Sequence, residues 1–164
     1  MKSIPSFTAA GSTDGAGASS TGRYAHVLLV EDSPTDAMMV REILAQVRVH
    51  AVLHVVDDGI EALQFLRREE PYRDAPRPDL ILLDLQLPRK GGQEVLGEIK
   101  SDERLRTIPV VVLTSSRETR DIAGAYRACA NSYVAKPIDY QEFAEAVRLI
   151  ERFWLGLAVP PEEE

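Results

Sequence analysis

The sequence predicts an α/β fold in which one parallel sheet of five strands carries helices on both faces. Five short runs of branched apolar residues alternate with five longer segments of helical periodicity. The runs are apolar at consecutive positions, as in strands that are covered on both faces. Because crossovers between parallel strands are right-handed and pass through helices, this order favours a doubly wound, flavodoxin-like sheet.

The strands are expected where the apolar runs occur, with a helix after each of them. The runs cover residues 27–30, 52–56, 80–83, 110–113 and 132–135. The intervening segments repeat apolar residues every three or four positions, which is the spacing of a helix with one buried face.

Capping residues mark where several of these helices begin. Ser33 is a preferred N-cap residue, and Pro34 after it suits the first helical position. Residues 58–61 and 139–142 each place an aspartate three positions before a glutamate, as in a capping box. Three prolines within residues 69–78 predict an irregular loop before the third strand.

The length and composition predict one folded domain. The chain has 164 residues, of which 45% are hydrophobic, and this suffices for one well-buried core. We expect the domain at residues 24–158. A flexible tail rich in Gly, Ser, Thr and Ala is expected at residues 1–23, and a solvated tail at residues 159–164.

Charge and cysteine content argue against several classes of protein. The formal net charge of −7 disfavours a nucleic-acid or anionic-membrane surface. The single Cys129 allows no intrachain disulfide and is ordinary for a reducing cytosol. No run approaches the roughly 18 apolar residues of a membrane span, and the start of the chain lacks a secretory signal core. We therefore expect a cytoplasmic protein.

Polar side chains follow four of the five predicted strands. They are Glu31 and Asp32 after the first strand, Asp84 after the third, Thr114 and Ser115 after the fourth, and Lys136 with Pro137 after the fifth. The carboxyl ends of parallel strands share one edge of a sheet, so these groups are expected to meet in one crevice.

The acids of this edge fit a magnesium site. Magnesium prefers hard oxygen ligands and takes one or two carboxylates together with water and phosphate oxygens. Asp32 and Asp84 meet that demand, with Glu31 close enough to bind directly or through water. Glu31 and Asp32 alone also fit acids at a helix N-terminus, where they complement the helix dipole.

A carboxylate beside such a cation can accept a phosphoryl group as an acyl phosphate. The cation, Lys136 and the hydroxyl of Thr114 would then neutralise its oxygens. Each residue also has a plainer interpretation: Thr114 and Ser115 can cap the next helix, and Lys136 can be a solvated strand end. Pro137 fits a tight turn, in which the preceding peptide bond can be cis.

The four strand ends resemble those of a known signalling family. Residues 27–32, 80–88, 111–115 and 133–137 strongly resemble the receiver domain of two-component response regulators, over residues 26 to about 155. The proline-rich loop and the stretches 87–92 and 153–155 resemble the single-domain regulators that serve phytochrome-type histidine kinases.

The resemblance assigns a role to each site residue. It implies that Asp84 is the phosphoacceptor and Asp32 the main Mg²⁺ ligand, with help from Glu31 and the backbone carbonyl of Gln86. The positions that it assigns to phosphoryl binding and switching are Thr114, Ser115, Tyr133 and Lys136. Pro137 is assigned to the turn. Two departures from the family pattern are Gly91, where Asp or Asn is commoner, and Gln86, a variable position that tunes hydrolysis.

The function implied is that of a stand-alone response regulator in a phosphorelay. A sensor histidine kinase, in particular one of the phytochrome type, would phosphorylate it in a Mg²⁺-dependent reaction and drive a conformational switch. No DNA-binding region is expected after the domain, so output would pass through protein contacts. The apolar residues Trp154, Leu155, Leu157 and Val159 suggest a homodimer through the last helix, or else partial packing on the domain's own sheet.

Three alternative functions fit the sequence less well. A phosphatase of the haloacid-dehalogenase type needs a second acid two residues after its nucleophile, where this chain has Gln86 or Pro34. A flavodoxin-like nucleotide binder needs a glycine-rich loop after the first strand, where this chain has acids. The third alternative is a receiver-like adaptor that works without phosphorylation, and only a measurement of phosphotransfer distinguishes it from a response regulator.

The remaining reactive side chains are expected to be structural. His26, His50 and His54 lack the spacing of metal ligands, and Cys129 is expected to be a small buried apolar residue.

Overall fold

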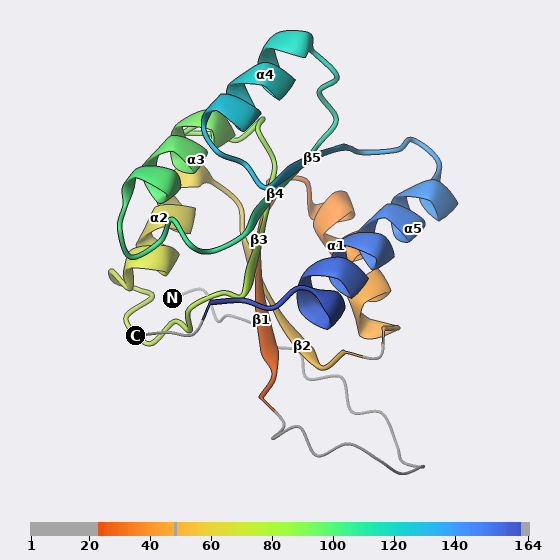
Figure 1. Ribbon diagram of the computed structural model, residues 1–164, viewed down its shortest axis with the longest axis horizontal. Coiled ribbons are helices and arrows are strands. Elements are labelled where there is room, and N and C mark those ends of the chain that lie inside the picture. The colour runs from red at the N-terminus through yellow and green to blue at the C-terminus, as the bar shows by residue number, and fades with distance from the viewer. Residues whose placement is uncertain (1–22, 48, 162–164) are drawn as a thin grey trace.

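The computed structural model describes residues 23–47 and 49–161, and Figure 1 shows their arrangement. Most of the two expected tails, residues 1–22 and 162–164, lies outside the described residues. The strands form one parallel sheet in the order β2-β1-β3-β4-β5. They are β1 (Ala25–Val30), β2 (Ala51–Val56), β3 (Leu80–Leu83), β4 (Val110–Thr114) and β5 (Ser132–Ala135).

The helices follow the strands in strict alternation, which confirms the predicted flavodoxin-like fold. They are α1 (Pro34–Ala45), α2 (Gly59–Arg67), α3 (Gly92–Ser101), α4 (Thr119–Arg127) and α5 (Tyr140–Glu151), which continues into a π-helical segment, η1 (Arg152–Leu157). None of the helices within the described residues is long and apolar enough to cross a membrane.

Both faces of the sheet are buried, as the consecutive apolar residues of its strands predicted. In Figure 1, α1 and α5 cover one face while α2, α3 and α4 cover the other. Successive residues of a strand enter different cores: Ile81 packs under α2 and α3, whereas Leu82 packs under α1 and α5. Every residue of β3 is buried, so the centre of the sheet is a rigid support for Asp84.

The register brings the carboxyl ends of the central strands level with one another. Val30 of β1 pairs with Leu83 of β3, and Leu83 pairs in turn with Val112 of β4. Thr114 at the end of β4 pairs with Ala135 at the end of β5. The polar residues that follow these strands are therefore delivered to one edge.

The predicted helix caps are present at three helices. The side chain of Ser33 accepts from the N–H of Asp36, and that of Asp58 accepts from the N–H of Glu61. Asp139 caps α5 by accepting from the N–H of Glu142. Helix α4 instead begins only at Thr119, so neither Thr114 nor Ser115 caps it.

One local expectation, the burial of Cys129, is wrong, and three further features were not foreseen. Cys129 is exposed and adopts a left-handed φ of 65° in the turn after α4. Among the described peptide bonds, the cis bond is Glu70–Pro71, so Lys136–Pro137 is trans. The periodicity did not reveal that the last helix widens into a π-helix at Arg152.

The third unforeseen feature is a contact between two histidines. The rings of His26 and His54 contact each other across β1 and β2, with Nδ1 and Nε2 3.1 Å apart. The pairing of the two strands brings together residues that are 28 positions apart in the chain.

Candidate functional site

Asp84 is at the centre of the polar edge, directly after the buried strand β3. The residue is only 5% exposed, and its N–H donates to the carbonyl of Val30. Helix α3 starts against its backbone, where a Cβ on Gly92 would collide with the Asp84 carbonyl. The glycine thus allows the close approach that holds this strand end in place.

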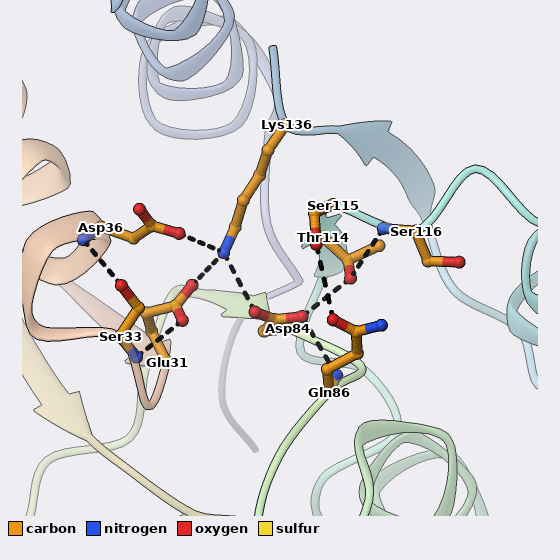
Figure 2. A network of polar contacts seen from close by, with 9 residues as sticks. All are labelled: Glu31, Ser33, Asp36, Asp84, Gln86, Thr114, Ser115, Ser116 and Lys136. Atoms are coloured by element: carbon orange, nitrogen blue, oxygen red, sulfur yellow. Dashed lines mark hydrogen bonds and ion pairs between the residues drawn. The ribbon is translucent and has the colours of Figure 1, made fainter. Parts of the chain in front are cut away.

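Both oxygens of the Asp84 carboxylate receive hydrogen bonds (Figure 2). Thr114 Oγ1 donates to Oδ1 at 2.8 Å, and the N–H of Gln86 donates to the same oxygen at 3.1 Å. Lys136 Nζ donates to Oδ2 at 3.0 Å. The three donors come from three separate segments, so the carboxylate is fixed in orientation by tertiary structure.

Lys136 is the cation of the site, and it contacts more acids than its single positive charge can neutralise. Its ammonium contacts Glu31, Asp36 and Asp84, and its side chain is 9% exposed. Burial disfavours the charged ammonium, but the hydrogen bonds with Asp36 and Glu31 outweigh burial and raise the pKa of Lys136. Lys136 is therefore charged, and one positive charge faces three carboxyl groups.

Three acids of this edge are arranged as a cation site. Ligand oxygens of Glu31, Asp32 and Asp84 all lie within 4.8 Å of one another. Glu31 and Asp84 are buried, while Asp32 is exposed and leaves the site open to solvent. Hard oxygen donors around an open position suit a small divalent cation that keeps part of its water.

The environment of the Glu31 carboxyl disfavours its ionised form. It accepts from the N–H of Ser33 at 3.0 Å and from Lys136. Burial nevertheless raises the pKa of Glu31 to about 7, with the charge of Asp84 adding to the shift. A divalent cation would oppose that shift and lower the pKa of Glu31, because it attracts the ionised form.

A second chain of contacts leads away from Asp84 toward α4. The N–H of Ser116 lies 3.5 Å from Thr114 Oγ1, and Ser116 Oγ donates to Asp121 at 2.6 Å. Tyr133 donates its hydroxyl to the Ser116 carbonyl at 2.9 Å. The loop between β4 and α4 is thus tied both to the carboxylate site and to β5.

Two predicted site residues lie at the rim. Ser115 is exposed, and its hydroxyl reaches the side-chain oxygen of Gln86 at 3.5 Å. Pro137 follows Lys136 in the turn between β5 and α5. Every predicted site residue is therefore within the described structure, and the strand ends bring them to one edge.

Sequence reasoning missed Asp36, Ser116 and Asp121. Asp36 occupies the first turn of α1, where an acid is already explained by the helix dipole. Its contact with Lys136, 100 positions away, has no local pattern. Ser116 and Asp121 were missed for the same reason: serine and acidic residues are common just before helices and in their first turn, so neither stands out in the sequence.

The sequence matches one known family over most of this fold. Residues 27–148 match the response regulator receiver domain. The chain belongs to that family of two-component signalling domains.

Two relatives are similar to this chain over most of their length. The chain is 42% identical over 135 residues to response regulator Rcp1 of Synechocystis, covering 82% of this chain and 92% of the relative. It is 41% identical over 131 residues to the probable methanogenesis regulatory protein FilR2 of Methanothrix harundinacea, covering 79% and 83%.

Two solved structures of response regulators are similar to this chain in both fold and sequence. The phosphorylated cyanobacterial phytochrome response regulator RcpA superposes with a TM-score of 0.83 at 44% identity, covering 85% of this chain and all of that one. The Mn²⁺-bound form of Rcp1 superposes with a TM-score of 0.81 at 41% identity, covering 84% and 99%. Rcp1 thus carries a divalent metal in a fold that is similar throughout the domain.

Proposed function

We propose that this protein is a response regulator whose Asp84 accepts a phosphoryl group from a sensor histidine kinase. One observation carries the proposal: a buried carboxylate is held by Thr114 and Lys136, one donor on each oxygen. The same donors suit the oxygens of a phosphoryl group attached to Asp84. The domain would act as a signalling switch, and its own chemistry would be limited to phosphotransfer and autodephosphorylation.

The phosphotransfer step is a displacement at phosphorus. An oxygen of Asp84 attacks the phosphorus of a phosphohistidine, and an O–P bond forms as the N–P bond breaks. The electron pair of that bond stays on the imidazole of the kinase. Autodephosphorylation is the attack of water on the same phosphorus, which releases inorganic phosphate and restores the carboxylate. Positioning and charge neutralisation are what the protein supplies.

Magnesium is the proposed cofactor, and the ligand set fits it. Glu31, Asp32 and Asp84 would hold the cation together with the backbone carbonyl of Gln86. When bound, the cation offsets negative charge on the transferred group. Lys136 and Thr114 bind and orient the remaining phosphoryl oxygens.

The switch is proposed to run through the β4–α4 loop. Thr114 would turn from the carboxylate toward a phosphoryl oxygen and draw Ser115 and Ser116 with it. Tyr133 of β5 donates its hydroxyl to the Ser116 carbonyl, so a shift of this loop changes the position that the tyrosine side chain can occupy. A signal at Asp84 would in this way reach the surface of α4, β5 and α5.

The proposed partners are a histidine kinase, in particular a phytochrome-type kinase as for the relatives, and a second copy of the chain. Leu149 and Phe153 are exposed one turn apart on α5 and η1, and Leu157 and Val159 are more exposed still. Trp154 and Leu155 are partly buried against the domain's own core. A symmetric dimer through α5 and its extension would cover the exposed apolar residues.

Phosphorylation by acetyl phosphate and Mg²⁺ tests the acceptor. We expect the wild type to gain the mass of one phosphoryl group and Asp84→Asn to gain none. Asp74→Asn, in the exposed loop before β3, is the matched control and should be phosphorylated normally. Phosphorylation of the Asp84→Asn protein would show that another residue is the acceptor.

A further inference from the structure

The ammonium of Lys136 has three acids for its three N–H groups, and one of them comes from a helix. Asp36 of α1 accepts from Nζ at 2.8 Å, while Glu31 and Asp84 accept from the strand ends (Figure 2). The lysine side chain is almost fully buried, so water does not replace a lost partner easily. Lys136 therefore has no N–H to spare.

A phosphoryl group on Asp84 can take more than one N–H of Lys136 only if the contact with Glu31 or with Asp36 is broken. The contact with Asp84 turns into the contact with the phosphoryl oxygens themselves. Glu31 belongs to the acid group that suits a cation. Asp36 lies outside that group, so the cation does not offset the charge of its carboxylate. Asp36 can therefore remain in contact with Lys136 when the cation and the phosphoryl group are bound.

We propose that Asp36 is a positioning residue that competes with the phosphoryl group for Lys136 and so weakens the phosphorylated state. The inference rests on the proposed function, since it assumes that Asp84 is the acceptor. The mechanism is electrostatic: an anion that shares the ammonium reduces its attraction for the incoming phosphoryl oxygens and repels them as well. Asp36 would thereby set how strongly the site holds the group that it receives.

A purely structural role for Asp36 predicts different behaviour. Its backbone N–H, rather than its side chain, completes the cap with Ser33. Asp36→Asn therefore leaves the cap intact and removes only the charge. If the carboxylate merely stabilised α1, its loss would loosen the site and weaken every ligand together.

The test is the affinity for beryllofluoride, a phosphoryl mimic, measured by calorimetry and amide NMR shifts at saturating Mg²⁺. For Asp36→Asn we expect beryllofluoride affinity to rise about tenfold, as for one charge-assisted hydrogen bond made available. The affinity for Mg²⁺ alone should fall by no more than about threefold, since Asp36 is not among the expected ligands. Opposite shifts of the two ligands are the signature of competition.

Two further variants serve as controls. Asp36→Glu keeps a carboxylate within reach of Lys136 and should bind beryllofluoride as the wild type does. Glu42→Gln removes one charge from the exposed face of the same helix and should change neither affinity. Unchanged or weaker beryllofluoride binding by Asp36→Asn would overturn the inference while the proposed function stands. If the wild type itself fails to bind the mimic with Mg²⁺, the proposed function fails and the inference with it.

Discussion

The two ends of the sheet both bury polar groups, but they balance them differently. At the amino end, the rings of His26 and His54 contact each other, and burial lowers the pKa of both. Near the same end, Lys100 donates to the carbonyls of Arg106 and Ile108 and to the side chain of Asn131. These groups have hydrogen-bond partners within the fold.

At the carboxyl end the polar groups are mismatched in charge. Lys136 faces Glu31, Asp36 and Asp84, and Asp32 lies beside them. Buried like charges are unfavourable unless opposite charge compensates them, and here one lysine faces three acids. The comparison teaches that the amino end is organised for stability, whereas the carboxyl end is organised for a ligand that carries positive charge.

Lys136→Met should have the largest effect of the changes that test this contrast. It leaves three acids without their cation, and removing one partner of a buried ion pair costs about 3–5 kcal/mol. We therefore expect the free energy of unfolding to fall by about that amount in metal-free buffer. Urea unfolding followed by circular dichroism measures it.

Magnesium supplies the control for Lys136→Met. If the carboxyl end lacks positive charge, Mg²⁺ should restore part of the loss and stabilise the variant more than the wild type. Equal stabilisation of both proteins by Mg²⁺ would mean that the acids are compensated by other means. The contrast between the two ends would then be wrong.

The sequence was sufficient for the fold and for most of the carboxyl end. The strands are apolar throughout because both faces of the sheet are covered. An acid directly after such a run, such as Asp84, shows where the strand ends. Parallel pairing then brings those ends together without further information. The predicted strands at residues 80–83 and 132–135 agree with β3 and β5 in both bounds.

Contacts between distant elements were beyond that reasoning. Asp36 and Lys136, like His26 and His54, meet only through the packing of elements, and the sequence carries no spacing that links them. The π-helical segment after α5 was missed because its residues also fit a regular helix. Cys129 was misplaced because an apolar residue in a turn after a helix can face either way.

His54 gives the second prediction, which sharpens the contrast from the amino end. Burial and the neighbouring His26 lower the pKa of His54 from 6.5 to about 4. The unfolded chain therefore binds a proton more readily than the folded one between these values, and stability is lost as the pH falls from about 6.5 toward 4. This one group should cost about 2 kcal/mol between pH 7 and pH 5.

Comparison of wild type with His54→Leu isolates that contribution. Urea unfolding at pH 7 and pH 5 should show a smaller loss in the variant, by about 2 kcal/mol. His50→Gln, at an exposed position before β2, should retain the pH dependence of the wild type. An identical pH dependence in His54→Leu would mean that the histidine pair is not held neutral by the fold.

Lys100→Met should have a smaller effect, because two of the three oxygens that it leaves have another route to a partner. Asn131 still accepts from the N–H of Val110, and the Arg106 carbonyl lies in the part of the molecule near solvent. We expect the free energy of unfolding to fall by about 1–2 kcal/mol. Mg²⁺ should leave this loss unchanged, in contrast to Lys136→Met, and a partial rescue by Mg²⁺ would break the distinction between the two lysines.

Asp32→Asn should have the smallest effect on stability, and its sign is the sharpest test of the contrast. The Asp32 carboxylate is exposed and makes no hydrogen bond or ion pair with the rest of the described chain, yet it lies beside Glu31 and Asp84. Its removal relieves repulsion and should stabilise the metal-free protein by about 0.5–1 kcal/mol. The same variant should lose most of the stabilisation by Mg²⁺, which for the wild type is about 2.7 kcal/mol at one hundred times the dissociation constant.

Urea unfolding with and without Mg²⁺ checks both halves of the Asp32→Asn prediction, with Asp74→Asn as the control for loss of an exposed acid. A metal-free protein made less stable by Asp32→Asn would mean that Asp32 supports the fold, as an acid beside a helix N-terminus can. A gain in stability together with the loss of the Mg²⁺ effect requires that the carboxylate is kept at a cost to the fold. That outcome assigns the excess negative charge of the carboxyl end to cation binding, because a group that only weakens the folded state has no structural reason to be there.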